Sequence, residues 1–273
     1  MSKIGSALKK VLKFKEAEIE KIGVSRDPEK EKKSKFFSEM SEECNECLVT
    51  LLDPRSPVAE QYRSLKTHLM GEAETRLIST FLVTSTIRGE GKTTTACNLG
   101  VTLANNPQHS VLIIDGDMRI PSVHKMFGIK YEKGLIEYLR GEADLDSLLV
   151  PTHLDNLFVL PAGEPCSNPS ELLASPRMRD LIKNEEAKGK GHYLIIDSPP
   201  IISTTDSRIL SGYAGGVILV VQSGKTPIDI INHGLSLLKN AQILGVVLNN
   251  ISGISPYYPY VYNYAYGYAE YSK

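Results

Sequence analysis

The chain has 273 residues, a length typical of one or two domains. With 31 basic and 32 acidic residues its formal net charge is −1, so it lacks the overall positive charge of nucleic-acid-binding proteins, and we expect no nucleic-acid partner. Four cysteines are too few for a disulfide framework, and no apolar run approaches the roughly 20 residues of a membrane-spanning helix. These features favour a globular cytoplasmic protein.

Residues 1–50 differ in composition from the rest of the chain. Five lysines and no acid lie between Met1 and Lys15, and Ile4, Leu8 and Val11 recur near helical spacing. Charges of both signs crowd the following twenty residues. We therefore predict a charged arm, helical or disordered, over 1–50; contact with an acidic membrane or a partner protein is the alternative.

Short apolar runs separated by helical segments begin near Leu51. Continuous β-branched runs between helices indicate a mostly parallel, doubly wound α/β sheet covered on both faces. The sequence therefore predicts one domain over 51–255, with a helix from about Thr93 to Asn105. The predicted strands are Phe81–Val83, Val111–Ile114, Leu157–Leu160, Tyr193–Ile196, Val217–Val221 and Leu244–Leu248.

A glycine-rich segment follows the first predicted strand and leads into a helix. It reads Arg88-Gly89-Glu90-Gly91-Lys92-Thr93-Thr94. The backbone amides of such a loop and the positive end of the following helix bind polyphosphate. We therefore predict that all seven residues contribute to an ATP-binding site. Lys92 is expected to reach the β- and γ-phosphates, and the Thr93 hydroxyl to bind Mg²⁺. The standard pattern has glycine six residues before the lysine, where this chain has Thr86.

Two further strands end in carboxylates. Asp115 and Asp117 follow the second predicted strand, and Asp197 follows the fourth. Because ligands of open α/β sheets bind at the carboxyl ends of the strands, we expect these acids to meet the glycine-rich loop. Asp115 and Asp197 would hold Mg²⁺ with Thr93, and Asp117 would accept a proton from a nucleophile. Lys92, Asp115 and Asp117 are the predicted catalytic residues.

These motifs resemble those of the bacterial tyrosine kinases, or BY-kinases, which are P-loop enzymes of capsule and exopolysaccharide synthesis. Gly91-Lys92-Thr93 matches the family's Walker A motif, Asp115, Asp117 and Arg119 match Walker A′, and Asp197 matches Walker B. The resemblance covers about residues 51–273. It implies a P-loop fold like that of MinD and ParA and an ATP- and Mg²⁺-dependent protein-tyrosine autokinase.

The resemblance also assigns residues outside the loop. Glu60, Arg63 and Lys66 are similar to a helix that packs on the neighbouring subunit, with Lys66 in place of an arginine. Asn249 is similar to a strand end that meets adenine. The low-complexity tail, residues 256–273, is similar to the family's autophosphorylation site. Its tyrosines are Tyr257, Tyr258, Tyr260, Tyr262, Tyr264, Tyr266, Tyr268 and Tyr271.

The family further implies partners and a location. A ring-like homo-oligomer would place each tail in a neighbour's active site. A separate membrane-embedded polysaccharide co-polymerase would activate the kinase and hold it at the inner face of the plasma membrane, and a phosphotyrosine phosphatase would reverse the reaction.

Three alternatives remain at this stage. An ATPase switch of the MinD or ParA type shares the fold, but it carries a signature lysine where this chain has Ile87. A non-catalytic adaptor would bind nucleotide without transferring phosphate. Finally, the tail is also consistent with an aromatic edge strand, because alternate tyrosines line one face of an extended chain.

Overall fold

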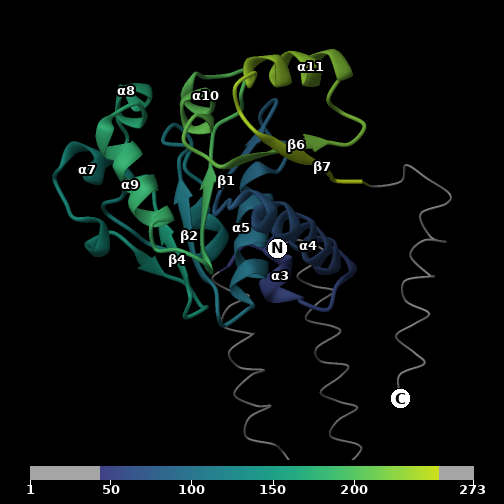
Figure 1. The fold of residues 1–273 in the computed structure, drawn as a ribbon, viewed down its shortest axis with the longest axis horizontal. Helices are drawn as coiled ribbons and strands as arrows, with labels where there is room; N and C mark the ends of the chain where they lie inside the picture. The colour runs from purple at the N-terminus through teal and green to yellow at the C-terminus, as the bar shows by residue number, and fades with distance from the viewer. Residues whose placement is uncertain (1–43, 252–273) are drawn as a thin grey trace, which may run out of the picture. The chain divides into compact units, whose positions relative to one another are not determined.

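The computed structural model describes residues 44–251 (Figure 1). These residues form a seven-stranded sheet in the order β3-β4-β2-β5-β1-β6-β7. All paired strands run parallel except β3, which is antiparallel to β4. The strands are β1 (Thr80–Ser85), β2 (Ser110–Asp115), β3 (Val150–Pro151), β4 (Leu157–Leu160), β5 (His192–Asp197), β6 (Gly216–Gln222) and β7 (Ile243–Asn249).

The six predicted strands and the doubly wound α/β class are confirmed. Strand β3 was not predicted because it has only two residues, one of them Pro151, and so shows no apolar run. The helix expected from Thr93 to Asn105 is present as α5 (Lys92–Ala104).

Helices cover both faces of the sheet, as Figure 1 shows. Helices α3, α4 and α5 pack together on one face, and α7 to α10 lie on the other. The remaining bounds are α3 (Val49–Leu52), α4 (Pro57–Arg76), α6 (Val123–Phe127), α7 (Leu135–Arg140), a 3₁₀ turn (Leu145–Ser147), α8 (Pro169–Leu173), α9 (Pro176–Glu186), α10 (Asp206–Ser211) and α11 (Ile228–Leu237).

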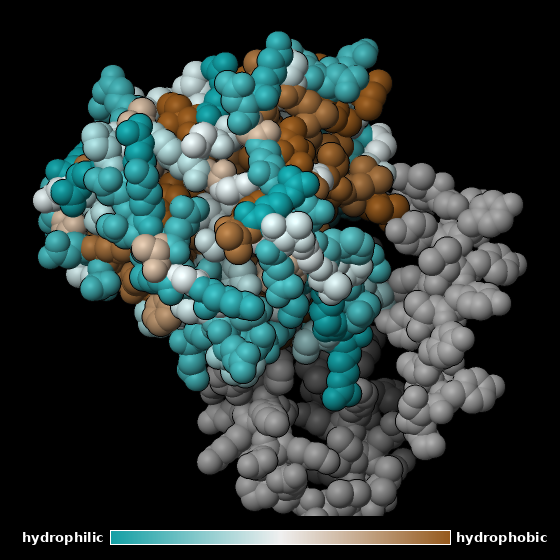
Figure 2. All heavy atoms as spheres, viewed as in Figure 1, coloured by the Kyte–Doolittle hydropathy of each residue, from teal (hydrophilic) through white to brown (hydrophobic). Residues whose placement is uncertain are grey.

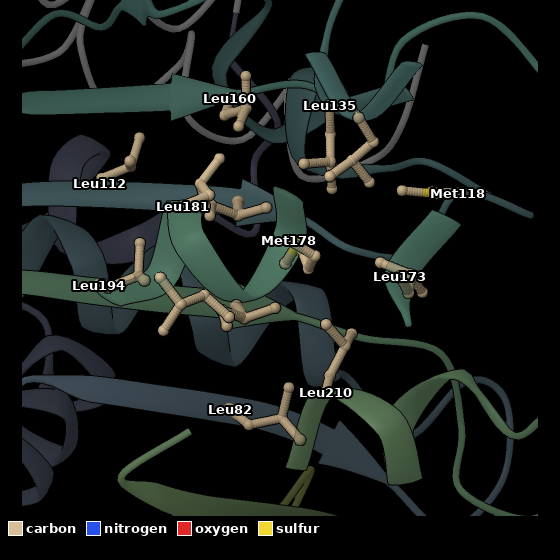
Figure 3. Close-up of a cluster of buried hydrophobic side chains, with 14 of the residues drawn as sticks. Leu82, Leu112, Met118, Leu135, Leu160, Leu173, Met178, Leu181, Leu194 and Leu210 are labelled. Carbon is tan, nitrogen blue, oxygen red and sulfur yellow. The ribbon is translucent and has the colours of Figure 1, made fainter. Parts of the chain in front are cut away.

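A large apolar cluster joins the sheet to its second helical layer (Figure 3). Leu82, Leu112 and Leu194 project from β1, β2 and β5. They meet Met178 and Leu181 of α9, both at most 1% exposed. Burial of one such side chain contributes about 1.5–3 kcal/mol, so this layer fixes the strand ends that carry the site.

The compact unit begins at Cys44, before the boundary predicted at Leu51. Leu48 is fully buried, and the Thr50 hydroxyl donates to Asn98 Oδ1 of α5 at 2.9 Å. The packing of this segment against α5 was not predicted, because residues 44–47 include few apolar side chains. Most of the predicted arm and the whole tyrosine tail lie outside the described residues. Among the described helices, none combines the length and hydropathy needed to cross a membrane.

Candidate nucleotide and phosphoryl-transfer site

The glycine-rich loop connects β1 to α5 through two left-handed residues. Gly89 and Gly91 have φ angles of 86° and 92°, a conformation that side chains disfavour. A Cβ on Gly91 would also collide with the Asn249 amide at the end of β7. Helix α5 then begins at Lys92, so its free amides face the concave loop. This backbone is suited to a polyphosphate.

Glu90 holds the loop in this shape. Its carboxylate is 1% exposed and accepts hydrogen bonds from the Ile87 amide at 2.8 Å and the Gln222 amide at 3.2 Å. The Thr226 hydroxyl donates to the same carboxylate at 2.5 Å, and Asn249 Nδ2 donates to the Glu90 carbonyl at 2.9 Å. The Glu90 side chain thus ties the loop to β6 and the chain before α11, and only its backbone is left for a phosphate.

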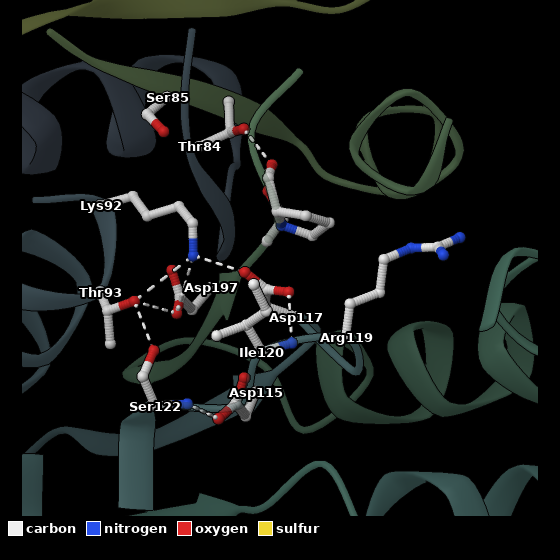
Figure 4. Close-up of polar contacts among 12 residues, drawn as sticks. Thr84, Ser85, Lys92, Thr93, Asp115, Asp117, Arg119, Ile120, Ser122 and Asp197 are labelled. Atoms are coloured by element: carbon white, nitrogen blue, oxygen red, sulfur yellow. Dashed lines mark hydrogen bonds and ion pairs between the residues drawn. The ribbon is translucent and has the colours of Figure 1, made fainter. Parts of the chain in front are cut away.

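Lys92 points into a group of carboxylates (Figure 4). Its Nζ lies 2.8 Å from Asp117 Oδ2 and 3.8 Å from Asp197 Oδ2. Burial alone would lower the pKa of Lys92, but the charges of Asp197 and Asp117 outweigh it and raise that pKa above its usual value. Lys92 is therefore a fixed positive charge at the mouth of the loop.

Thr93 and two aspartates form a second part of the site, beside Lys92 (Figure 4). Asp115 and Asp197 are register partners on β2 and β5, which places both carboxylates at one edge of the sheet. The Thr93 hydroxyl donates to Asp197 Oδ2 at 2.6 Å and lies 3.1 Å from Ser122 Oγ. Asp115 Oδ2 accepts the Ser122 and Val123 amides at 2.9 and 3.0 Å.

Asp115 and Asp197 each have one carboxylate oxygen that takes part in none of these hydrogen bonds. Asp115 Oδ1 and Asp197 Oδ1 are buried and have no hydrogen-bond partner among the described residues. Buried carboxylate oxygens without a donor are costly, and a divalent cation beside a hydroxyl satisfies them. The described residues contain no group of three or more His, Cys, Asp or Glu that could hold a metal ion. Mg²⁺ would therefore complete its shell with phosphate and water, as it commonly does.

Burial raises the pKa of both carboxylates. Desolvation, followed by repulsion from Asp197, raises the pKa of Asp115 to about 8. Desolvation likewise raises the pKa of Asp197 to about 6, against the lowering effects of Lys92 and Thr93. A bound cation removes this penalty, so the electrostatics of the pair fit the predicted magnesium site.

Arg119 pairs with an acid, one of the two roles that the sequence allowed for it, although the sequence did not identify its partners. Its Nε donates to Asp206 Oδ2 at 2.8 Å, and its Nη2 donates to Ser170 Oγ at 3.2 Å. Ser170 in turn donates to Asp206 Oδ1 at 2.5 Å. Asp206 is 1% exposed and lies 87 residues from Arg119 in the chain, so no local pattern signals the pair.

The other predicted site residues lie at three places. Arg88 is exposed on the loop, Thr94 is half-buried in the first turn of α5, and Asn249 contacts the loop itself. On α4, Arg63 pairs with Glu60 at 2.6 Å, whereas Lys66 Nζ donates to the Thr102 carbonyl at 3.3 Å. The predicted subunit interface on α4 and the tail phosphoacceptors stay predictions.

The fold and this loop define a P-loop nucleotide-binding protein. Residues 81–244 match the model of an AAA domain. The solved structure of the Pyrococcus furiosus cell division ATPase MinD shares the fold, with a TM-score of 0.53 and 28% identity over 65% of this chain and 73% of that chain.

Comparisons with further proteins point to a narrower class of P-loop protein. The chain is 33% identical to the tyrosine-protein kinase YwqD of Bacillus subtilis, over 74% of this chain and 85% of the relative. It is 32% identical to the succinoglycan biosynthesis transport protein ExoP of Rhizobium meliloti, over 72% of this chain and 25% of ExoP. The kinase domain of the Escherichia coli tyrosine kinase ETK superposes with a TM-score of 0.69 at 26% identity, covering 76% of this chain and 81% of that domain.

The chain belongs to the bacterial tyrosine-protein kinase family. The family and enzyme class expected from the sequence are thereby confirmed, and so is the MinD-like P-loop fold. Ile87, at the position of the signature lysine of the MinD-type switches, is consistent with this assignment.

Proposed function

We propose that this chain transfers the γ-phosphoryl group of ATP to tyrosines of the 256–273 tail of a neighbouring copy. The observation that carries the proposal is the convergence of Lys92, Thr93, Asp115, Asp117 and Asp197 at one end of the sheet (Figure 4). These residues would supply a positive charge, a cation site and a candidate base at one edge of the sheet. Phosphoryl transfer requires mainly such positioning and charge stabilisation.

Each residue has a distinct proposed role. The loop amides and Lys92 would stabilise charge on the γ-phosphoryl oxygens. To do so, the Lys92 ammonium would leave Asp117 and pair with the phosphate. Thr93, Asp115 and Asp197 would hold Mg²⁺, which neutralises charge on the phosphates when bound. Asp117 would then accept the phenol proton as the tyrosine oxygen bonds to phosphorus and the bond from phosphorus to the ADP oxygen breaks. Arg119, held by Asp206, would fix the loop that bears Asp117.

The biological setting is proposed from the relatives. ExoP is named for succinoglycan biosynthesis, which supports a role in exopolysaccharide or capsule synthesis and export. A ring-like oligomer, a separate membrane activator and an opposing phosphotyrosine phosphatase complete the proposal. The activator would hold the chain at the inner face of the plasma membrane.

Mass-spectrometric mapping of phosphotyrosine tests the catalytic proposal. The wild-type chain incubated with ATP and Mg²⁺, with and without a cytoplasmic activator segment, should carry phosphate on the tail, and Lys92→Met should carry none. Mixing Lys92→Met with a catalytically active chain that lacks tail tyrosines should restore phosphate on the Lys92→Met tail if transfer occurs between copies. A wild-type chain that hydrolyses ATP but never acquires phosphotyrosine would instead be an ATPase switch.

A further inference from the structure

The outer edge of β7 is apolar and open. β7 is the last strand of the sheet and has no neighbour on its outer side among the described strands. Val246 and Leu248 are 53% and 51% exposed, and no residue from Ile243 to Asn249 is charged. Figure 2 shows apolar side chains gathered over this part of the molecule, where α11 also exposes Ile228 and Ile230.

Natural proteins rarely leave such an edge unprotected. Open edge strands recruit other strands, and they are normally guarded by charges, prolines, bulges or covering segments. The opposite edge is guarded: β3 has two residues and ends in Pro151. The pairing of β7 with β6 shifts register once, between Ile243 and Gly245. From Val246 to Asn249, β7 has no charge, proline or further register shift, and no described segment covers its outer side, so we expect another segment to cover it.

The backbone of β7 sets which residues a new strand would meet. The Ser223 amide donates to the Asn249 carbonyl at 2.9 Å, so Asn249 faces β6. Because backbone groups alternate along a strand, Val246 is oriented like Leu248, and both direct their amide and carbonyl to the open edge. Their register partners, Leu219 and Val221, belong to the apolar cluster under α11. The side chains of Val246 and Leu248 therefore share that face.

The tail sequence has the matching alternation. Tyrosine occupies every even position from Tyr258 to Tyr268, whereas the odd positions include Pro259 and Gly267. Proline fits an edge strand only where its missing N–H would face solvent. Even positions would then make the backbone ladder to Val246 and Leu248, and cross-strand partners share a face. The tyrosines would thus cover the exposed apolar side chains.

We propose that the beginning of the 256–273 tail, in its unphosphorylated state, pairs antiparallel with the seven residues of β7 in the same chain as an eighth strand. The chain already turns at Asn250, whose φ is 55°, and Gly253 and Pro256 favour a reversal in the next few residues. A short connection gives the tail an effective concentration of order mM at its own β7, which favours it over the tail of another copy.

Phosphorylation would release the docked tail. Each phosphotyrosine adds about −1.5 to −2 charges, which an apolar face cannot accommodate. This consequence rests on the proposed kinase activity, whereas docking itself does not. The docked part of the tail would hold its own tyrosines away from active sites until it detaches, so the β7 edge would set how readily these tyrosines become substrates.

Hydrogen exchange at single amides tests the docking. The full chain, dephosphorylated and without nucleotide, is compared with a variant in which the six even-numbered tyrosines from 258 to 268 are replaced by serine. The Val246 and Leu248 amides should exchange at least about tenfold faster in the variant, while the inward Val247 amide stays unchanged. The control Tyr257→Ser/Tyr271→Ser changes only odd positions and should exchange like wild type.

A second measurement tests the same contact by a substitution in β7. Val246→Lys should speed chymotryptic cleavage of the tail several-fold, whereas Val58→Lys should not, because Val58 is equally exposed (52%) but lies on α4. Equal exchange of Val246 and Leu248 in the wild-type and six-serine chains would overturn the proposal. Protection that rises with protein concentration would also overturn it, and would assign the edge to a second copy. Neither result depends on phosphate transfer, so failure of the kinase proposal is seen separately.

Discussion

The buried charged groups at the two ends of the sheet differ in how completely they are paired. At the amino end, Glu185 accepts a hydrogen bond from His192 at 2.8 Å and pairs with Lys188 at 2.7 Å. At the carboxyl end, Asp115 and Asp197 each keep a buried oxygen without a partner among the described residues, although Lys92 lies close by. The groups of the first cluster are paired with one another and stabilise the fold, whereas the second cluster keeps two carboxylate oxygens unpaired within residues 44–251. Two buried carboxylate oxygens without a hydrogen-bond partner in the described part of the chain, at the same edge of the sheet, thus mark the candidate functional site.

The largest expected effect comes from removing the lysine of the carboxyl-end cluster. Lys92→Met should lower phosphate transfer by at least about 10²–10³-fold, because charge on the transferring group loses its main fixed cation. The initial rate of tail phosphorylation measures this loss. The matched control is Lys188→Met at the amino end, which should transfer phosphate at the wild-type rate; an equal loss in both variants would contradict the comparison.

Neutralising one carboxylate should separate activity from stability. Asp115→Asn should lower transfer by about 10²-fold, since a magnesium ligand is lost. Without Mg²⁺ and nucleotide, the same variant should unfold about 2–4 °C higher, which corresponds to about 1 kcal/mol from removing a carboxyl group that burial and repulsion from Asp197 destabilise. Calorimetry with and without Mg²⁺ measures both parts. A lower melting temperature in the ligand-free variant would show that the site is not electrostatically strained.

The same strain predicts a pH dependence. The pKa values of Asp115 and Asp197 are raised in the fold, to about 8 and about 6, above the ordinary aspartate value near 3.9. The native state then binds more protons than the unfolded state, so ligand-free stability should fall as pH rises from about 4 to 8. Asp115→Asn should flatten the upper part of this decline. Melting curves at constant ionic strength measure it, and a stability that rises over pH 6–8 would refute the sign.

The smallest expected effect belongs to the paired cluster at the amino end. Burial favours a higher pKa for Glu185, but hydrogen bonds from His192 and Lys188 outweigh it and hold that pKa below its usual value. Glu185 therefore stabilises the fold above about pH 4.5, and this contribution is lost as pH falls through its folded-state pKa. Glu185→Gln should cost about 1 kcal/mol at pH 7 and much less at pH 4, with transfer unchanged. A uniform loss across pH would indicate packing rather than charge.

Sequence patterns located the loop and its acids because these features are local. Lys92 and Thr93 follow a strand and open a helix, and Asp115 and Asp197 each end an apolar run. The convergence of the two acids followed from a general rule of parallel sheets, and their register pairing agrees with it. The contacts of Glu90 and Arg119 could not be found this way. Glu90 bonds to Thr226 across 136 residues, and Arg119 to Asp206 across 87.

By itself, the sequence determined the parallel α/β class, the phosphate-binding loop and the carboxylates that face it, because strand period, glycine placement and strand-end residues are properties of short segments. Only the tertiary structure decided which groups are satisfied and which are left open. Burial and hydrogen bonding depend on partners brought together from distant segments. They left one oxygen each of Asp115 and Asp197 without a donor among the described residues, and they left the outer edge of β7 exposed.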